Sequence, residues 1–100
     1  METTVNYNNG KTVITINGRL DTEQSMLFAK DIEAIADGQL TLVDIDCTAL
    51  EYISSSGLRV FISLLKRVTR VGGKLTLQHV NSNVKSVLDL TGFSSLFTIE

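Results

Sequence analysis

A near-continuous apolar run in the middle of the chain limits the folds that are open to it. The residues from Leu40 to Ile45 are all apolar except Thr41 and Asp44. A run this short is typical of a strand that is buried on both faces, as the strands of parallel sheets are. A strand of this kind needs helices to cover it, so the flanking sequence should supply them.

The segments on either side of the run do alternate between strand and helix patterns. Val5 to Asn8 and Thr12 to Asn17 flank Asn9-Gly10, the pair that a type I′ turn prefers, and predict an opening β-hairpin. A strand break is expected over 18–21, followed by a helix over 25–37 that is capped by Asp21 or Thr22 and ended by Gly38. The remaining elements are expected to be the strand over 40–45, a loop over 47–52, a helix over 56–71, a strand over 74–80, a helix from Asn81-Ser82 to Gly92 and a short strand within 93–99.

This order predicts an α/β fold in which a mixed sheet of about four or five strands, opening with the hairpin, is packed with about three main helices. The length of 100 residues indicates one domain over 1–100.

A single cysteine excludes an internal disulfide and a cysteine-based zinc site, and Cys47 is expected to be a small apolar residue beside a buried strand. Asp44 and Asp46 share a strand face but lack a loop of oxygen ligands, so neither a metal nor a cofactor is expected.

Charge and hydropathy exclude other classes of partner. The chain has no apolar run long enough to cross a membrane and no basic start followed by an apolar stretch, which predicts a cytoplasmic protein without a membrane partner. Residues 1–51 hold nine acids and three bases, whereas residues 52–100 hold two acids and six bases. The bases lie singly or in pairs without interleaved aromatic residues, so no nucleic-acid partner is expected. The asymmetry can instead steer a charged partner.

Three adjacent serines, Ser54 to Ser56, stand where the sequence changes from strand to helix, and Gly57 follows them. Free N–H groups at a helix start bind a capping hydroxyl or a phosphate, so these serines are either helix caps or a phosphate-bearing site. The only imidazole is that of His79, expected at the surface or an edge, and a Gly-x-Ser-x-Gly elbow is absent. These observations argue against a hydrolase, and no enzymatic activity is expected.

Several motifs together resemble the STAS domain, and most closely the stand-alone bacterial anti-sigma factor antagonists. The likeness runs from about Val5 to Ile99. The segments that carry it are Gly18-Arg19-Leu20-Asp21, Asp44-Ile45-Asp46, Tyr52-Ile53-Ser54-Ser55-Ser56-Gly57-Leu58, Gly72-Gly73-Lys74-Leu75 and Val84 through Thr91-Gly92-Phe93.

The resemblance implies a partner-switching function. An unphosphorylated antagonist of this family binds an anti-sigma factor that is also a serine kinase and thereby frees the sigma factor; phosphorylation by the kinase releases the antagonist, and a phosphatase resets the cycle. The family's phosphoacceptor position falls on Ser55. The family's preceding Asp is replaced here by Ser54, and Ser56 is a competing acceptor. The alternative is a STAS scaffold or adaptor subunit of a sensory or transport complex that has no phosphorylation switch.

The surface expected to bind the partner follows the second helix. On a helical wheel Leu58, Phe61, Ile62, Leu65 and Val68 form the core face, while Val60, Leu64 and Val71 lie at one flank. These three residues are expected either to pack on a neighbouring helix or to be exposed to a partner, and at least Val60 is expected to be partly exposed beside the acceptor. A basic stripe of Arg59, Lys66, Arg67 and Arg70 is expected either to face an acidic partner or simply to be solvated. The expected partner-binding residues are Asp21, which matches an acidic position of the family near the acceptor, and Ser54, Ser56, Gly57, Arg59, Val60, Ser63 and Arg67.

Overall fold

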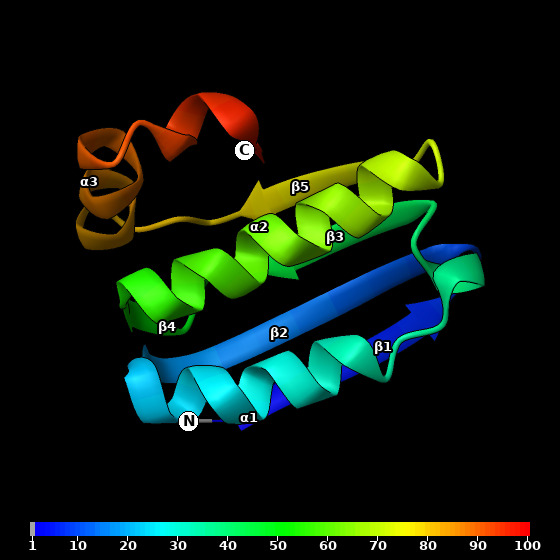
Figure 1. Cartoon of the computed structure of the whole chain (residues 1–100), viewed down its shortest axis with the longest axis horizontal. Helices are drawn as coiled ribbons and strands as arrows, with labels where there is room; N and C mark the ends of the chain where they lie inside the picture. The colour runs from blue at the N-terminus through cyan, green and yellow to red at the C-terminus, as the bar shows by residue number, and fades with distance from the viewer. Residues whose placement is uncertain (1) are drawn as a thin grey trace.

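The computed structural model describes residues 2–100 and has the expected α/β architecture (Figure 1). Its helices and strands are β1 (Glu2–Asn8), β2 (Lys11–Leu20), α1 (Thr22–Glu33), β3 (Leu42–Asp46), β4 (Leu50–Ile53), α2 (Ser55–Arg70), β5 (Lys74–Gln78), α3 (Ser82–Leu90) and β6 (Thr98–Ile99), with 3₁₀ helices at Asp37–Gln39 and Phe93–Leu96. Among residues 2–100, no helix combines the length and the apolar character that crossing a membrane requires.

The strands form one mixed sheet in the order β1-β2-β3-β5-β6, and β4 pairs with the end of β2. The β1–β2 hairpin is antiparallel, and the other pairs are parallel. Asn9 and Gly10 both have positive φ, 53° and 80°, as a type I′ turn requires. The predicted hairpin and the parallel setting of the central strand are therefore confirmed.

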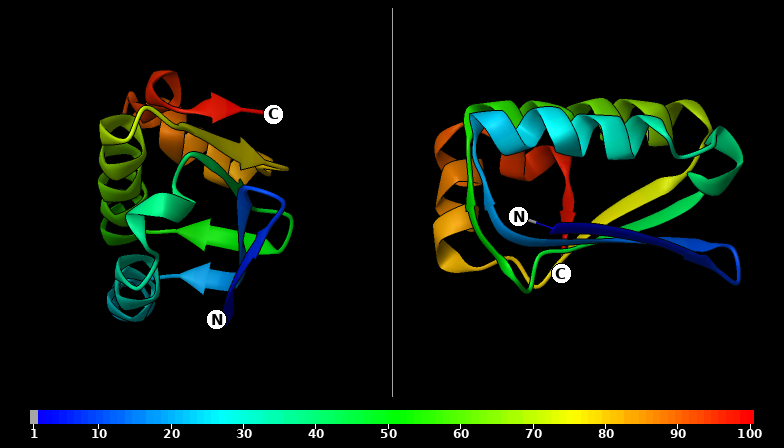
Figure 2. Two further views of the ribbon diagram at one scale, coloured as in Figure 1. Left: turned by 90° about the vertical axis from the view of Figure 1, so that its right-hand side faces the viewer. Right: turned by 90° about the horizontal axis from the view of Figure 1, so that it is seen from below.

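The helices α1 and α2 lie side by side on one face of the sheet, and their first residues lie at the same end of the molecule (Figures 1 and 2). Alternate residues of β2, including Ile14 and Ile16, are fully buried beneath them. Phe28 of α1 and Phe61 of α2 meet edge to face with ring centroids 5.9 Å apart. The core between the sheet and the helices therefore also fixes how the two helices sit against each other.

Two strand predictions were wrong in the segments that lead into α1 and α2. Gly18 to Leu20 continue β2 through a register shift instead of breaking it, and the predicted loop over 47–52 contains most of β4. β4 is four residues long and exposes Glu51 and Tyr52, so neither its length nor its pattern indicates a strand. Its pairing with β2 stabilises it, and this tertiary contact positions the start of α2.

Other boundaries also differ from the predictions. α1 is capped by Asp21, one of the two predicted caps, but it ends at Glu33, and Gly38 lies in the 3₁₀ helix beyond it. β3 begins at Leu42, two residues after the predicted start at Leu40. Leu40 precedes the strand but is still buried in the core, which explains the apolar pattern that suggested a longer strand. The final segment forms a 3₁₀ helix before the short β6.

Cys47 is fully buried, as expected, and burial raises the pKa of its thiol to about 12. Because a thiolate is the reactive form, we expect Cys47 to resist 5,5′-dithiobis(2-nitrobenzoate) in the native protein at pH 8 and to react rapidly in 6 M guanidinium chloride. Absorbance at 412 nm follows both reactions. Rapid labelling of the native protein at a rate independent of unfolding would contradict the buried position.

Candidate functional site

The three serines at the start of α2 have three different environments. Ser54 is the N-cap residue: its hydroxyl accepts a hydrogen bond from the Gly57 N–H at 3.1 Å, and its own N–H donates to the Leu20 carbonyl at 2.9 Å. Only 8 % of Ser54 is exposed. Ser55 is the first residue of α2 and is exposed, whereas Ser56 is half-buried. Since Ser54 supplies the cap, the hydroxyl of Ser55 is not needed to start the helix.

The starts of α1 and α2 are joined through a buried serine that the sequence analysis missed. The Ser25 hydroxyl donates to the Asp21 carbonyl and lies 3.4 Å from the Ser54 hydroxyl oxygen. The Asp21 carboxylate accepts from the Gln24 N–H at 2.8 Å and caps α1. The structure thus brings exposed Asp21 to the serine segment, as the resemblance implied. No sequence signal separates Ser25 from an ordinary helical serine.

Gly57 lets α2 approach the end of β2 closely. A Cβ atom at this position would lie 2.7 Å from Leu20 Cδ2 and 3.1 Å from Ile53 Cγ1. The contact with Leu20 is shorter than real Cβ contacts, so a larger residue would require either the buried Leu20 side chain or the helix start to shift. Gly57 therefore acts through packing that fixes the position of Ser55, and it is buried.

A groove runs between α1 and α2, beginning one turn beyond Ser55. Its lining residues are Ala29, Ile32 and Glu33 of α1 and Arg59, Val60, Ser63, Leu64 and Arg67 of α2. Val60 is half-buried, which confirms the expected partial exposure, and Arg59 and Ser63 are exposed. Leu64 is fully buried because α1 packs against that side of α2, so for this residue the alternative of packing on a neighbouring helix is confirmed.

The expectation that Arg67 belongs to a free basic stripe was wrong. Its guanidinium donates to the carbonyls of Ile32 at 3.0 Å and Ile35 at 2.7 Å, and it pairs with Asp37 at 3.0 Å. Arg67 thus satisfies carbonyl groups at the C-terminal end of α1, where a cation is favourable. It holds the two walls of the groove together.

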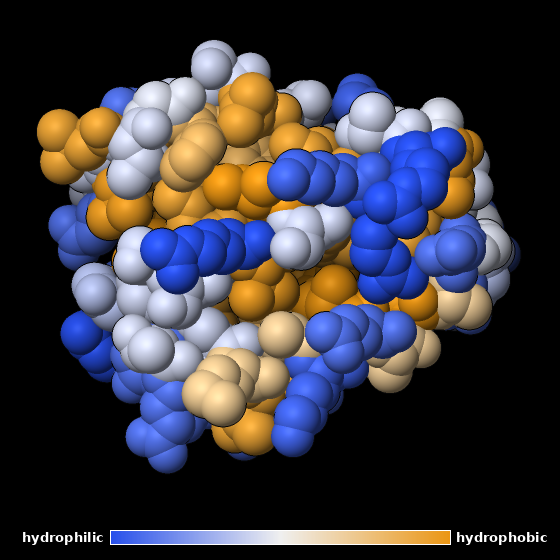
Figure 3. Space-filling model, viewed as in Figure 1, coloured by the Kyte–Doolittle hydropathy of each residue, from blue (hydrophilic) through white to orange (hydrophobic). Residues whose placement is uncertain are grey.

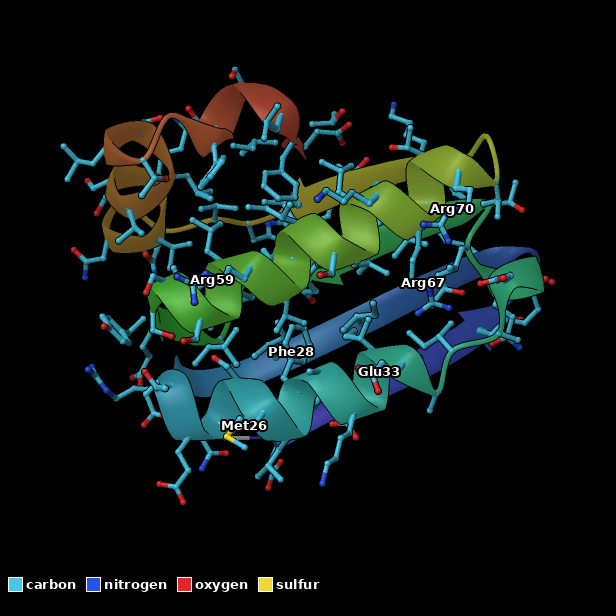
Figure 4. All side chains as sticks on the ribbon, viewed as in Figure 1. Met26, Phe28, Glu33, Arg59, Arg67 and Arg70 are labelled. Atoms are coloured by element: carbon cyan, nitrogen blue, oxygen red, sulfur yellow. The ribbon has the colours of Figure 1, made fainter. Side chains whose placement is uncertain are left out.

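We expect Arg67→Met to lower the free energy of unfolding by about 1.5–3 kcal/mol, because hydrogen bonds from a charged donor are lost while the apolar stem is kept. Arg70→Met is the matched control, since Arg70 is exposed near the same end of α2 (Figure 4). Urea denaturation of both variants measures the difference. Equal stability of the two variants would show that the Arg67 contacts contribute little.

A family model described as the STAS domain matches residues 1–100. The chain belongs to the STAS domain family. It is 28 % identical over 99 residues to BtrV of Bordetella bronchiseptica, named as a candidate anti-sigma factor antagonist, with 99 % of this chain and 85 % of that protein covered. It is 26 % identical over 99 residues to the anti-sigma-B factor antagonist of Bacillus subtilis, with 95 % and 86 % covered.

Solved structures agree with this STAS assignment at the level of the fold. SpoIIAA, described as an anti-sigma factor antagonist, superposes with a TM-score of 0.78 in its unphosphorylated form, at 19 % identity over 99 % of this chain and 87 % of that one. The phosphorylated form of SpoIIAA, a Bacillus protein, gives a TM-score of 0.75 at 19 % identity, with 99 % and 91 % covered. The predicted family and fold class are therefore confirmed.

Proposed function

We propose that this STAS domain is an anti-sigma factor antagonist that works by partner switching. The unmodified chain binds an anti-sigma factor that is also a serine kinase, and phosphorylation of Ser55 releases it. The observation that carries the proposal is the division of labour at the start of α2, where Ser54 is buried as the cap and Ser55 is exposed. The named anti-sigma factor antagonists among its relatives support the same role.

The proposed binding surface surrounds Ser55. Asp21 and Ser56 lie beside the acceptor, and Ser54 and Gly57 hold the helix start in place. Arg59, Val60 and Ser63 extend the surface along α2, and Arg67 contributes by fixing the groove walls. None of these residues has a catalytic role in the proposal: the kinase supplies the chemistry, a phosphatase resets the switch, and the cycle runs in the cytoplasm.

A phosphate on Ser55 should leave the domain folded. It adds about −1.5 to −2 charges at the first residue of α2, where the positive end of the helix dipole favours an anion. The release must then arise in the complex, where bulk and charge enter an interface that fits a neutral hydroxyl. Ser56 is the alternative acceptor, and its half-buried position makes it harder for a kinase to reach.

One observation favours a second function, a scaffold or adaptor subunit without the switch. Ser54 stands where the family's acceptor motif has Asp, so a kinase that reads that acid would not recognise this chain. Such a scaffold would need the same exposed surface but would keep its partner at all times. The two functions therefore differ in what ATP does to the complex.

The test is a titration of the purified chain against the kinase-type anti-sigma factors encoded by the same organism. We expect micromolar or tighter binding, followed by dissociation when ATP is added. A non-hydrolysable ATP analogue is the control and should leave the complex intact. A complex that persists with ATP would support the scaffold, and no binding to any of these anti-sigma factors would contradict the antagonist role.

A further inference from the structure

The groove between α1 and α2 is small, and its floor is apolar. Ile32 and Leu64 line it and are almost fully buried, and the Phe28–Phe61 pair lies between the two helices (Figure 4). Its volume is about 160 Å³. Pockets for small-molecule ligands usually span about 300–1,000 Å³, so this groove suits a single side chain better than a free metabolite.

The charge of α2 indicates the kind of partner segment that would supply this side chain. α2 contains four bases and no acid, and Arg67 is paired with Asp37. Within residues 2–100, Arg59, Lys66 and Arg70 form no ion pair. They are seven and four residues apart and so lie on one stripe of the helix. Arg59 lines the groove, Lys66 and Arg70 continue the stripe beyond it, and Glu33 is the acid on the opposite wall. On the face of the molecule seen in Figure 3, apolar surface lies between hydrophilic side chains.

We infer that the groove receives one apolar side chain from an acidic segment of the partner protein. The acids of that segment would meet Arg59, Lys66 and Arg70, and the apolar side chain would bury itself between Ile32 and Leu64. An anchor side chain that fills a desolvated pocket within a polar rim is the usual form of an interface hot spot, and charges at the rim mainly steer the encounter. This inference rests on the proposed function, because it assigns the groove to the same partner that covers Ser55, one turn before Arg59.

Photo-crosslinking tests the identity of the occupant. We place p-benzoylphenylalanine at Ser63 and at Glu33, one on each wall of the groove, and at exposed Ser86 of α3 as the control. The full chain is irradiated in cells of the source organism, and the crosslinked peptides are identified by mass spectrometry. We expect both groove positions to label the same segment of a kinase-type anti-sigma factor, in which Asp or Glu residues flank an apolar residue.

Three results would overturn the inference: labelling of a segment without acidic residues, labelling of lipid or nucleic acid in place of protein, or no labelling at either groove position.

A groove-filling variant separates this inference from the proposed function. Ala29→Leu narrows the groove without changing Ser55, and Ser86→Leu is the matched control on α3. We expect Ala29→Leu to weaken binding of the purified anti-sigma factor at least tenfold, with an unchanged circular dichroism spectrum, and Ser86→Leu to have no effect. If Ser55→Glu weakens binding but Ala29→Leu does not, the groove inference fails and the proposed function stands. If the wild-type chain does not bind the anti-sigma factor, the proposed function fails.

Discussion

Ser55→Glu is expected to bind a kinase-type anti-sigma factor about 100-fold more weakly than the wild-type chain, whereas Ser55→Ala binds with wild-type affinity and is not released by ATP. A 100-fold loss corresponds to about 2.7 kcal/mol. Desolvating an unpaired charge in an interface can cost more than that. Because Ser55 is exposed and Ser54 caps α2, neither substitution should unfold the domain. Isothermal titration calorimetry measures the affinities.

The neighbouring serine supplies the control for this experiment. Ser54→Ala removes the cap of α2 and should lower stability by about 0.5–2 kcal/mol, which the Ser55 variants should not do. A loss of affinity in Ser55→Glu that is matched by an equal loss of stability would point to unfolding instead of the switch. Wild-type affinity of Ser55→Glu would contradict the mechanism.

Gly73→Ala should produce the largest change in stability. A Cβ atom at Gly73 would lie 2.4 Å from the Leu40 carbonyl oxygen and 2.7 Å from that of Thr41, and both are backbone atoms that cannot rotate away. Overpacking commonly costs about 1–3 kcal/mol, and we expect the upper end of that range here. For a domain of this size the melting temperature should fall by more than about 10 °C.

Gly38→Ala is the matched control for the Gly73 variant. A Cβ atom at Gly38 would meet nothing within 4 Å, and its φ does not lie in the left-handed region. Alanine at this position should therefore leave stability unchanged or raise it slightly, because it restricts the unfolded chain. Thermal unfolding followed by circular dichroism compares the two variants. Similar melting temperatures would show that the segment around Leu40 moves to accommodate the methyl group.

The parts of the fold that sequence predicts are those with local signals. Asn9-Gly10 specifies the hairpin turn, and a left-handed Gly72 follows the end of α2. β4 carries no such signal, because its strand conformation depends on pairing with β2. The contacts at the end of α1 are likewise non-local: Arg67, more than 30 residues away in sequence, binds the carbonyl of Ile32 in α1 and that of Ile35 just beyond it.

The same distinction holds for the site. The serine motif and the family resemblance were enough to place Ser55 at the start of a helix, and the capping role of Ser54 follows from its position there. The link through Ser25 and the groove were not predictable, because both exist only once α1 is packed beside α2. Arg67 was misread for this reason: a helical wheel places it on the outer side of α2 but does not include the carbonyls of the neighbouring helix.

The measurement that tests the switch most directly is the mapping of phosphate on the wild-type chain. The purified protein is incubated with its kinase-type anti-sigma factor and ATP, and peptides covering residues 51–59 are fragmented by mass spectrometry. The partner-switching account predicts one phosphate on Ser55, with Ser55→Ala unmodified and Ser56→Ala still modified. A phosphate on Ser56 would move the acceptor by one residue and leave the switch in place. A phosphate outside residues 54–56, or none while the complex persists, would contradict the account.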